Sequence, residues 1–376
     1  MKKREVVRGA KDFLPDEAGR KREIENSAVD VFQRWGYREV VTPTFEYLEV
    51  IEAGAGTNMR DELFLMQDRD GRLLALRPEM TIPLARVAST RMADDLTPLR
   101  LFYSANIFGH TETQIGRYKE FYQLGVELIG TAGARADAEV IALAAEILNR
   151  QELSFQISLN HIGIFHALIE NSGLTELQKE QVMRLTLHKD LVGLEQLLAG
   201  LPIKDEYREA FMALPVTRGG IEAFSKIRSM VALPDVARAV EELTAVYNLI
   251  GQYGIKDQVS IDLGILRGFD YYTGIIFEGY SPNLGYPLLG GGRYDRLLEK
   301  FGKPMPATGF AVGVERILLC LQGEPPKPKQ QRLIVRGDDL AAVLDKARDL
   351  RFQGHIAEVD LSGEPVGTPV QIREVE

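Results

Sequence analysis

LRLFYSANIFGHTETQIGRYKEFYQLGVELIG, residues 99–130, predicts two strands joined by a polar loop. Both ends of the stretch are rich in β-branched and aromatic residues, which favour strands. On the second strand Gln123 and Glu127 are four residues apart, so their side chains point to the same face of the sheet. The leucine and valine residues that alternate with them point to the opposite face and predict a core there. A polar pair on the face opposite a core indicates a binding pocket.

The segments on either side predict further elements of a mixed α and β fold. Before the pair of strands we expect a helix over residues 17–35, a strand over 36–47 that bends at Pro43, a hairpin that turns at residues 70–71, and another helix. Pro78 is expected in the first turn of this second helix, with Glu79 beside the positive end of its dipole. After the pair we expect a helix over residues 137–151 and strands over 258–266 and 271–280.

Between about residues 165 and 250 the sequence is leucine-rich, has helical periodicity and contains few strand formers. This stretch predicts an all-helical insertion in the sheet. Residues 323–331 are rich in proline and lysine and predict a linker. We therefore expect a core domain over residues 1–325 and a small strand–helix–strand unit with a tail over residues 332–376. A unit of that size does not easily bury an independent core.

The composition is that of a globular protein, with 376 residues of which 45% are hydrophobic and 26% are charged. The net charge of -9 disfavours binding to a polyanion such as nucleic acid. The single cysteine, Cys320, lies in an apolar run and is expected to be a buried, unreactive thiol, which fits a reducing compartment. No signal-peptide pattern and no long apolar run is present, so we expect a cytoplasmic protein that does not enter a membrane.

The sequence lacks the common motifs for phosphate and metal binding. The triple glycine at residues 290–292 continues into RYDRL, without the lysine and the serine or threonine that a P-loop needs. The five histidines are scattered and the only cysteine is far from them. We therefore expect no metal site and no cofactor.

Four other segments place polar residues at the starts of expected strands or helices: LRPEMT (76–81), LRGFDYYTG (266–274), GGGRYD (290–295) and GFAVGVERI (309–317). Together with the stretch at 99–130 they resemble the motifs of the histidyl-tRNA synthetase group of class II aminoacyl-tRNA synthetases. The resemblance covers nearly the whole chain. It implies an α+β fold with an antiparallel sheet of six or seven strands flanked by helices, a helical insertion, and an α/β unit at the C-terminus.

The same resemblance implies a pocket for L-histidine. Glu79 and Thr81 match positions that hold the α-amino group of the ligand, and a carboxylate is the natural partner of an ammonium. Glu127 and Tyr272 match positions that engage the imidazole, whose nitrogens need partners once they leave water. The remaining matches are Gln123 and Arg267 near the ligand carboxylate, and Tyr271 and Tyr294 as aromatic walls. Taken singly, the same residues also fit a helix cap, a solvated carboxylate and core tyrosines.

The nucleotide side of the pocket departs from the synthetase pattern. Where that family has Phe-Arg-x-Glu at the end of the first strand, Phe108 is followed by Gly109 and, two residues later, by Thr111. A glycine has no guanidinium to brace a phosphate, and losing one such donor typically costs about 10²–10³ in rate. Arg117 and Arg316 match retained positions and could make residual anion contacts. We therefore expect no catalytic residues and no aminoacylation.

The C-terminal unit is the second departure, because residues 332–376 match only the first part of the synthetases' anticodon-binding domain. A synthetase-like chain that keeps the histidine pocket without the charging chemistry resembles the ATP phosphoribosyltransferase regulatory subunits of histidine biosynthesis. That resemblance implies a homodimer within a hetero-oligomer, the short-form ATP phosphoribosyltransferase catalytic subunit as partner, L-histidine as feedback effector, and no tRNA binding. The alternatives are a divergent histidyl-tRNA synthetase and a synthetase-like regulator that binds RNA.

Overall fold

The computed structural model describes residues 5–110, 118–266, 271–321 and 332–375. The chain divides into two compact units, Met1–Leu321 and Gln322–Glu376. Each unit has hydrophobic core residues of its own. Cys320 is a free thiol buried in the core of the larger unit, as its apolar surroundings in the sequence indicate.

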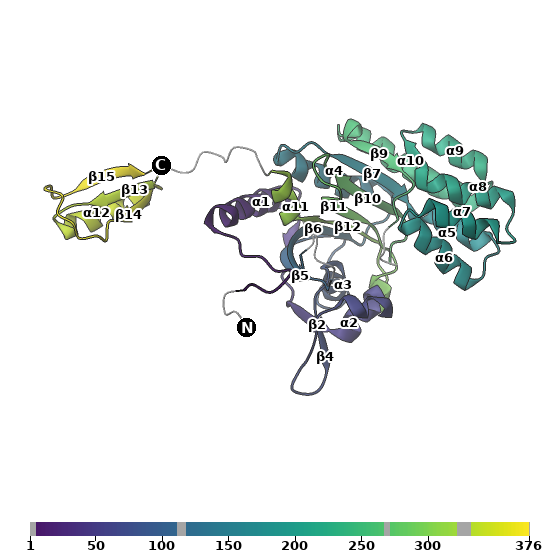
Figure 1. Ribbon diagram of the computed structural model, residues 1–376, viewed down its shortest axis with the longest axis horizontal. Helices are drawn as coiled ribbons and strands as arrows, with labels where there is room; N and C mark the ends of the chain where they lie inside the picture. Colours follow the sequence, from purple (N-terminus) through teal and green to yellow (C-terminus); the bar gives the residue numbers. More distant parts are fainter. Residues whose placement is uncertain (1–4, 111–117, 267–270, 322–331, 376) are drawn as a thin grey trace. The chain divides into compact units, whose positions relative to one another are not determined.

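One large sheet forms the centre of the larger unit (Figure 1). Its strands are β1 (Arg38–Glu39), β5 (Leu99–Phe108), β6 (Glu120–Ile129), β7 (Gln156–His161), β8 (Arg218–Gly219), β9 (Val259–Asp262), β10 (Ile275–Tyr280), β11 (Leu289–Arg293) and β12 (Ala307–Gly313). Over the described residues these nine strands follow the order β1-β5-β6-β12-β11-β10-β7-β9-β8. The expected pair of strands at 99–130 is β5 and β6, which are antiparallel neighbours.

The six adjacent strands from β5 to β7 are antiparallel throughout. At the edges β1 pairs with β5 in parallel and β9 pairs with β7 in parallel. The expected six or seven strands therefore describe the antiparallel centre, and the short edge strands extend the sheet to nine. Residues 36–47 were expected as one bent strand but form β1 and β2 (Phe45–Tyr47), which belong to different sheets. Pro43 lies between them and has no N–H with which to continue the pairing.

Four helices cover one face of the large sheet. They are α1 (Pro15–Arg34), α4 (Ala134–Arg150), α10 (Pro234–Gln252) and α11 (Val314–Cys320). Phe102, Val126 and Phe310, from three neighbouring strands, point into the core beneath these helices. Among the described residues, no helix is long and apolar enough to cross a membrane.

The opposite face of the sheet carries shorter elements. They are α2 (Leu48–Ala55), α3 (Thr81–Thr90), the 3₁₀ helices η1 (Thr57–Glu62) and η4 (Leu298–Phe301), and a small sheet of β2, β3 (Leu65–Gln67) and β4 (Leu73–Leu76). The expected hairpin at residues 70–71 joins β3 to β4. Leu101, Tyr103 and Ile107 of β5 point into a second core on this side. The alternation along β5 and β6 thus directs one set of side chains into the core under the helices and the other set, which includes Gln123 and Glu127, toward the second core.

The start of α3 differs from expectation. The helix begins at Thr81, so Pro78 precedes it and does not lie in its first turn. The two oxygens of the Glu79 carboxylate accept hydrogen bonds from the backbone N–H groups of Thr81 (3.0 Å) and Ile82 (2.6 Å). These are N–H groups of the first turn, which have no partner within the helix, so Glu79 does lie at the positive end of the helix dipole.

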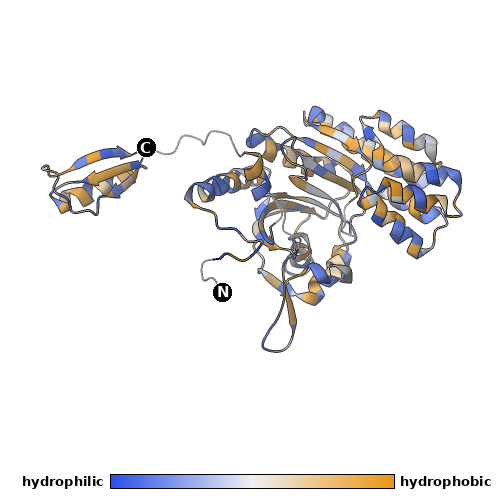
Figure 2. Cartoon of the chain, in the orientation of Figure 1, coloured by the Kyte–Doolittle hydropathy of each residue, from blue (hydrophilic) through white to orange (hydrophobic). Residues whose placement is uncertain are grey.

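The chain between β7 and β9 is helical apart from the short β8. Besides α10 it contains α5 (Ile162–Asn171), α6 (Glu176–Leu187), α7 (Leu191–Ala199), α8 (Asp205–Ala213), α9 (Glu222–Met230), and the 3₁₀ helices η2 (Leu214–Val216) and η3 (Lys256–Gln258). Helices α5 to α9 gather into one group on the side of the sheet that carries β7 and β9 (Figure 1). Each of these helices carries both hydrophobic and hydrophilic residues (Figure 2). His161 caps α5, because its Nδ1 accepts a hydrogen bond from the backbone N–H of Gly163 (3.1 Å).

In its described residues, 332–375, the smaller unit consists of a three-stranded sheet and one helix. Its elements are β13 (Arg332–Arg336), α12 (Leu340–Phe352), β14 (Ile356–Val359) and β15 (Gln371–Val375), and the strand order is β14-β13-β15. Leu333 and Val335 of β13 pack against Val343, Ala347 and Leu350 of α12. The segment expected as a tail contributes β15, which pairs antiparallel with β13. Its sequence, QIREV, is mostly polar, so it has no clear strand signal of its own.

Candidate ligand-binding site

A cavity of 210 Å³ lies on the face of the sheet opposite α1 and α4. Seven of the eight residues expected to contact histidine line it: Glu79, Thr81, Gln123, Glu127, Tyr271, Tyr272 and Tyr294. The eighth, Arg267, lies outside the described residues, and so does Arg117. Arg316 also lines the cavity. Residues from five separate stretches of the chain therefore meet at one place.

Glu127 lines the cavity and is only 1% exposed. It stands on β6 directly opposite Gly309 of β12. A Cβ atom built at residue 309 would lie 1.8 Å from Glu127 Oε2, so only a glycine leaves room for this carboxylate. Gly309 of β12 is therefore part of the site, because it leaves the space that the Glu127 side chain occupies.

Two hydroxyl groups hold the Glu127 carboxylate. Thr81 Oγ1 donates a hydrogen bond to Oε1 (2.8 Å), and the Tyr294 hydroxyl donates one to Oε2. Burial raises the pKa of Glu127 to about 8, while these two hydrogen bonds act in the opposite direction. A carboxyl group with such a pKa gains from a cationic or hydrogen-bond-donating ligand that replaces water as its partner.

Glu79 places a second carboxylate in the same cavity and is 6% exposed. Besides the N–H groups of α3, it accepts a long hydrogen bond from the Tyr271 hydroxyl (3.4 Å). Burial raises its pKa, although the hydrogen bonds from the first turn of α3 favour the ionised form. Two buried acidic groups in one small cavity form a site for a positively charged group.

Tyrosine rings form one wall of the cavity. The ring centres of Tyr271 and Tyr272 are 4.9 Å apart, and those of Tyr271 and Tyr294 are 5.8 Å apart at an interplanar angle of 71°. Tyr103 lies across Gly125, where an added Cβ atom would come within 2.4 Å of the tyrosine hydroxyl. This arrangement gives a wall of aromatic rings next to two carboxyl groups, which suits a small aromatic cation.

Gln123 and Arg316 lie on the lining of the same cavity. The side-chain oxygen Oε1 of Gln123 is buried and has no hydrogen-bond partner among the described residues. A buried polar atom without a partner is costly, so a ligand donor or an ordered water at this place would be stabilising. The guanidinium of Arg316 donates a hydrogen bond to the carbonyl oxygen of Pro287 and lies 5.5 Å from the centre of the Tyr286 ring.

Gly109 continues the ladder of β5 and β6 beyond Phe108. Its backbone N–H donates to the carbonyl oxygen of Lys119 (2.9 Å), and the N–H of His110 donates to the carbonyl oxygen of Glu62 (2.8 Å). The backbone at this position is thus held as the end of a strand, but the residue offers no side chain. Thr111 lies outside the described residues.

Arg77 supports the site but was not singled out from the sequence. It is 5% exposed, and its guanidinium donates to the backbone oxygen of Asn106 (2.9 Å), to Asn106 Oδ1 (3.0 Å) and to the backbone oxygen of Thr42 (2.9 Å). It therefore ties the segment that carries Glu79 to the end of β5. The motif LRPEMT contains this arginine, but its partners are 29 and 35 residues away in the chain, so no local pattern indicates them.

Among the described residues, no group of three or more histidine, cysteine, aspartate or glutamate side chains is arranged to hold a metal ion. The polar lining of the cavity consists of carboxyl groups, tyrosine hydroxyls and an amide oxygen, and it favours an organic ligand with several N–H groups.

Comparison with known proteins places the chain in a family. The sequence model of the histidyl-tRNA synthetase family matches residues 9–317. A protein of Desulforamulus reducens named ATP phosphoribosyltransferase regulatory subunit is 43% identical over 352 residues, which cover 92% of this chain and 87% of that protein. A protein of Moorella thermoacetica with the same name is 42% identical over 353 residues, covering 94% and 91%. The chain belongs to the family of ATP phosphoribosyltransferase regulatory subunits.

Solved structures agree with this family and its fold. The crystal structure of an ATP phosphoribosyltransferase regulatory subunit/histidyl-tRNA synthetase from Bacillus halodurans is similar with a TM-score of 0.87 and 34% identity, over 96% of this chain and 94% of that chain. Histidyl-tRNA synthetase from Nostoc shares the fold with a TM-score of 0.79 at 21% identity, over 96% and 87%. The α+β, class II synthetase-like fold and the regulatory-subunit family, both inferred from the motifs, are thus confirmed.

Proposed function

We propose that this chain is the non-catalytic regulatory subunit of an ATP phosphoribosyltransferase and that L-histidine binds in the cavity as its feedback effector. In this proposal the chain assembles with a short-form catalytic subunit, which transfers the phosphoribosyl group from phosphoribosyl pyrophosphate to ATP at the first step of histidine biosynthesis. The observation that carries the proposal is the pair of buried carboxyl groups, Glu79 and Glu127, beside a wall of tyrosines in a cavity of 210 Å³.

The chemistry of histidine matches this lining group by group. Its ammonium pairs with Glu79, whose oxygens have lone pairs left beyond those used by α3. Its imidazole pairs with Glu127, and the three tyrosines Tyr271, Tyr272 and Tyr294 enclose the ring and exclude water. Gln123 and Arg267 are proposed to meet the ligand carboxylate. A cavity of this volume suits a ligand well below drug size.

The absence of a side chain at Gly109 supports the non-catalytic part of the proposal. Adenylation of an amino acid needs a cation against the phosphate whose charge increases in the transition state. In the synthetase pattern that cation comes from the residue after the phenylalanine of β5, and here this residue is glycine. Binding of histidine without activation of histidine is the consequence.

Feedback inhibition requires that histidine bind one state of the complex more tightly than another, because a ligand with equal affinity for both states shifts nothing. The cavity is built from segments that meet only in the folded arrangement: the start of α3, β6, and the tyrosine-bearing segments around β10 and β11. We propose that histidine stabilises the state in which these segments are closed around it, and that the catalytic subunit is less active in that state.

The remaining expectations belong to the same proposal. The chain acts as a homodimer within a hetero-oligomer, it does not bind tRNA, and it works in the cytoplasm. Each of these stays a prediction.

The test is to mix the purified chain with a short-form catalytic subunit and to measure phosphoribosyl-ATP formation with and without L-histidine. We expect activity to rise on mixing and to fall again with histidine. The control is histidine-dependent exchange between ATP and pyrophosphate by the chain alone, for which we expect no signal. Catalytic activity that does not change on mixing, or robust exchange by the chain alone, would contradict the proposal.

A further inference from the structure

Arg293 is the last residue of β11 and directly precedes Tyr294, yet its side chain points away from the cavity. It lies opposite Thr308 of β12, which in turn lies opposite Leu128 of β6. Residues opposite each other in neighbouring strands share a face, and Leu128 belongs to the core under the helices. Arg293 and Tyr294 therefore stand on opposite sides of the sheet.

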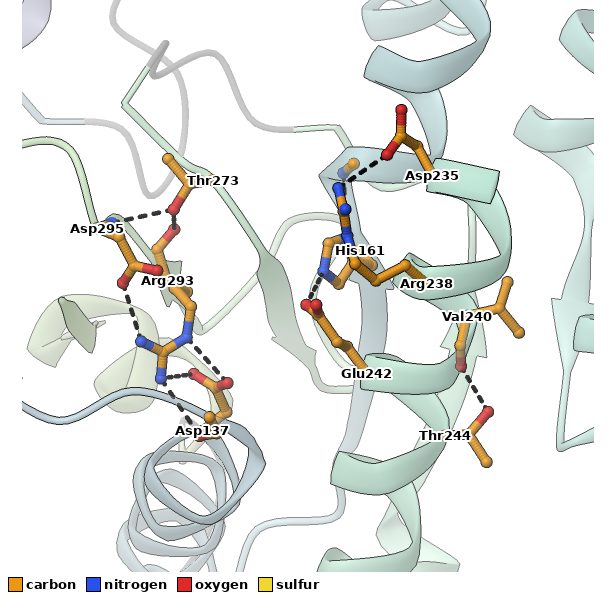
Figure 3. Close-up of polar contacts among 12 residues, drawn as sticks. Asp137, His161, Asp235, Arg238, Val240, Glu242, Thr244, Thr273, Arg293 and Asp295 are labelled. Carbon is orange, nitrogen blue, oxygen red and sulfur yellow. Dashed lines mark hydrogen bonds and ion pairs between the residues drawn. The ribbon is translucent and has the colours of Figure 1, made fainter. Parts of the chain in front are cut away.

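Arg293 is only 6% exposed, and its guanidinium lies between two carboxylates (Figure 3). Its Nε donates to Asp137 Oδ2 (3.0 Å) and its Nη2 pairs with Asp137 Oδ1 (2.9 Å), so the contact with the first turn of α4 is bidentate. Its Nη1 donates to Asp295 Oδ1 (2.9 Å). Both neighbours of Tyr294 in the chain are thus fixed by the same network.

The backbone of Arg293 holds a second tyrosine-bearing segment. Its carbonyl oxygen accepts hydrogen bonds from the backbone N–H of Thr273 (2.8 Å) and from the Thr273 hydroxyl (3.4 Å). The Thr273 hydroxyl also accepts from the backbone N–H of Asp295 (3.0 Å). Thr273 directly follows Tyr271 and Tyr272. One residue on the helix side of the sheet therefore connects all three tyrosines of the cavity wall.

We propose that Arg293 is a positioning residue, which holds the hydroxyl of Tyr294 on the Glu127 carboxylate from the opposite side of the sheet and so sets the affinity of the cavity for its ligand. This inference rests on the proposed histidine site. The GGGRYD segment then has two roles: Tyr294 contacts Glu127 in the cavity, and Arg293 anchors the segment to α4.

A substitution that keeps the charge separates this task from general stability. Arg293→Lys retains a cation but cannot make the bidentate contact with Asp137. Arg100→Lys is the matched control, because Arg100 makes a bidentate contact with Glu139 on the same helix α4, through Nε (2.8 Å) and Nη2 (2.8 Å). We expect Arg293→Lys to weaken L-histidine binding about tenfold or more in calorimetry, as for a loosened hydrogen bond to a charged group, while Arg100→Lys stays near the wild type.

A double-mutant cycle with Tyr294→Phe tests whether Arg293 acts through that hydroxyl. If it does, Arg293→Lys should cost much less affinity in the Tyr294→Phe background than in the wild type, since residues that act on one another are not additive. Fully additive losses would overturn the proposal and leave Arg293 a purely structural residue. Asp295→Asn, which keeps the contact with Asp137, replaces Arg293→Lys in the same cycle if the latter does not fold.

The titration of Glu127 in the absence of ligand tests the role of Arg293 independently of the proposed histidine site. The Tyr294 hydrogen bond lowers the pKa of Glu127, so its loss should move the carboxyl titration of Glu127 to higher pH in Arg293→Lys but not in Arg100→Lys. Carboxyl carbon NMR follows this titration, and Glu127→Gln assigns the signal. Besides Tyr294, the titratable or charged groups around Glu127 are Glu79, Tyr37, Tyr103, Tyr271, Tyr272 and Arg316, and neither variant replaces any of them.

A wild-type chain that binds no histidine would contradict the proposed function, and the titration would still decide the role of Arg293. A Glu127 titration that is the same in Arg293→Lys and in the wild type would overturn the positioning role, even if histidine binds.

Discussion

Glu127 on β6 lies directly opposite Gly309 on β12, and a Cβ atom at residue 309 would come within 1.8 Å of the Glu127 carboxylate. The carboxyl group therefore occupies the space that a side chain on the next strand would fill. The buried position of Glu127 thus depends on the glycine at residue 309. Neither residue alone explains the site.

Gly309→Ala should consequently disrupt the site, although residue 309 has no side chain that could contact a ligand. The added methyl group must displace the Glu127 carboxylate, so we expect histidine binding to be lost and stability to fall by about 1–3 kcal/mol, as for other overpacked positions. Calorimetry and denaturant unfolding measure the two effects. Gly19→Ala on α1 is the control: an added Cβ there has no neighbour within 4 Å, so binding should be unchanged and stability slightly higher. Wild-type affinity in Gly309→Ala would show that Glu127 does not contact the ligand.

The titration of Glu127 predicts a pH dependence of stability. Burial raises its pKa to about 8 in the folded chain, from an ordinary value of 4.5. The folded state therefore holds a proton that the unfolded chain releases between these values. The contribution of Glu127 to stability is complete below pH 4.5 and is lost as the pH rises through 8.

Glu127→Gln should remove this dependence, because an amide does not titrate. As the pH rises from 5 to 8, the unfolding free energy of the wild type should fall relative to that of Glu127→Gln, by up to about 1.4 kcal/mol per pH unit. Denaturant unfolding at several pH values measures the difference. Glu49→Gln, at an exposed position of α2, controls for the substitution itself and should run parallel to the wild type. A constant difference between wild type and Glu127→Gln would mean that the carboxyl group is ionised at neutral pH.

Strand alternation made the ligand face of β6 predictable from the sequence. The period of two places Gln123 and Glu127 on one face and Leu124 and Val126 on the other, whatever the rest of the fold does. The motifs then supplied the family and with it the sheet. The start of α3 was misplaced because proline at a first turn is common, whereas here the carboxylate of Glu79 sets the helix start.

The supporting networks could not be predicted in this way. Arg293 meets Asp137, which is 156 residues away, and Arg77 meets Asn106, which is 29 residues away. Neither pair has a spacing that indicates a contact, because the contacts arise only when distant strands are brought together. The short β8 and β15 were missed for a different reason, since segments of two and five residues do not establish a period.

Arg77→Lys tests one of these networks. The single ammonium group of lysine cannot replace the arginine at both Asn106 and Thr42. Buried oxygen atoms of these residues therefore lose their hydrogen-bond donors. We expect a loss of about 2–3 kcal/mol in unfolding free energy, together with weaker histidine binding, because Glu79 lies two residues further along. Arg34→Lys on α1 is the control: this exposed arginine forms an ion pair with Asp30 of its own helix, and its change should stay within about 0.5 kcal/mol. An Arg77→Lys variant as stable as Arg34→Lys would show that the network is not needed.

Tyr272→Phe decides whether histidine uses this cavity or another place, such as an interface with the catalytic subunit. Tyr272 lines the cavity and is 9% exposed, so a hydroxyl that meets the imidazole there is shielded from water. Its removal should weaken histidine binding roughly tenfold, while Glu127→Ala should abolish binding. Tyr253→Phe, at a tyrosine that is 46% exposed at the end of α10, should bind as the wild type does. If both cavity variants keep wild-type affinity in calorimetry while histidine still inhibits the assembled complex, the effector site lies elsewhere, and the cavity is an inherited pocket without a regulatory role.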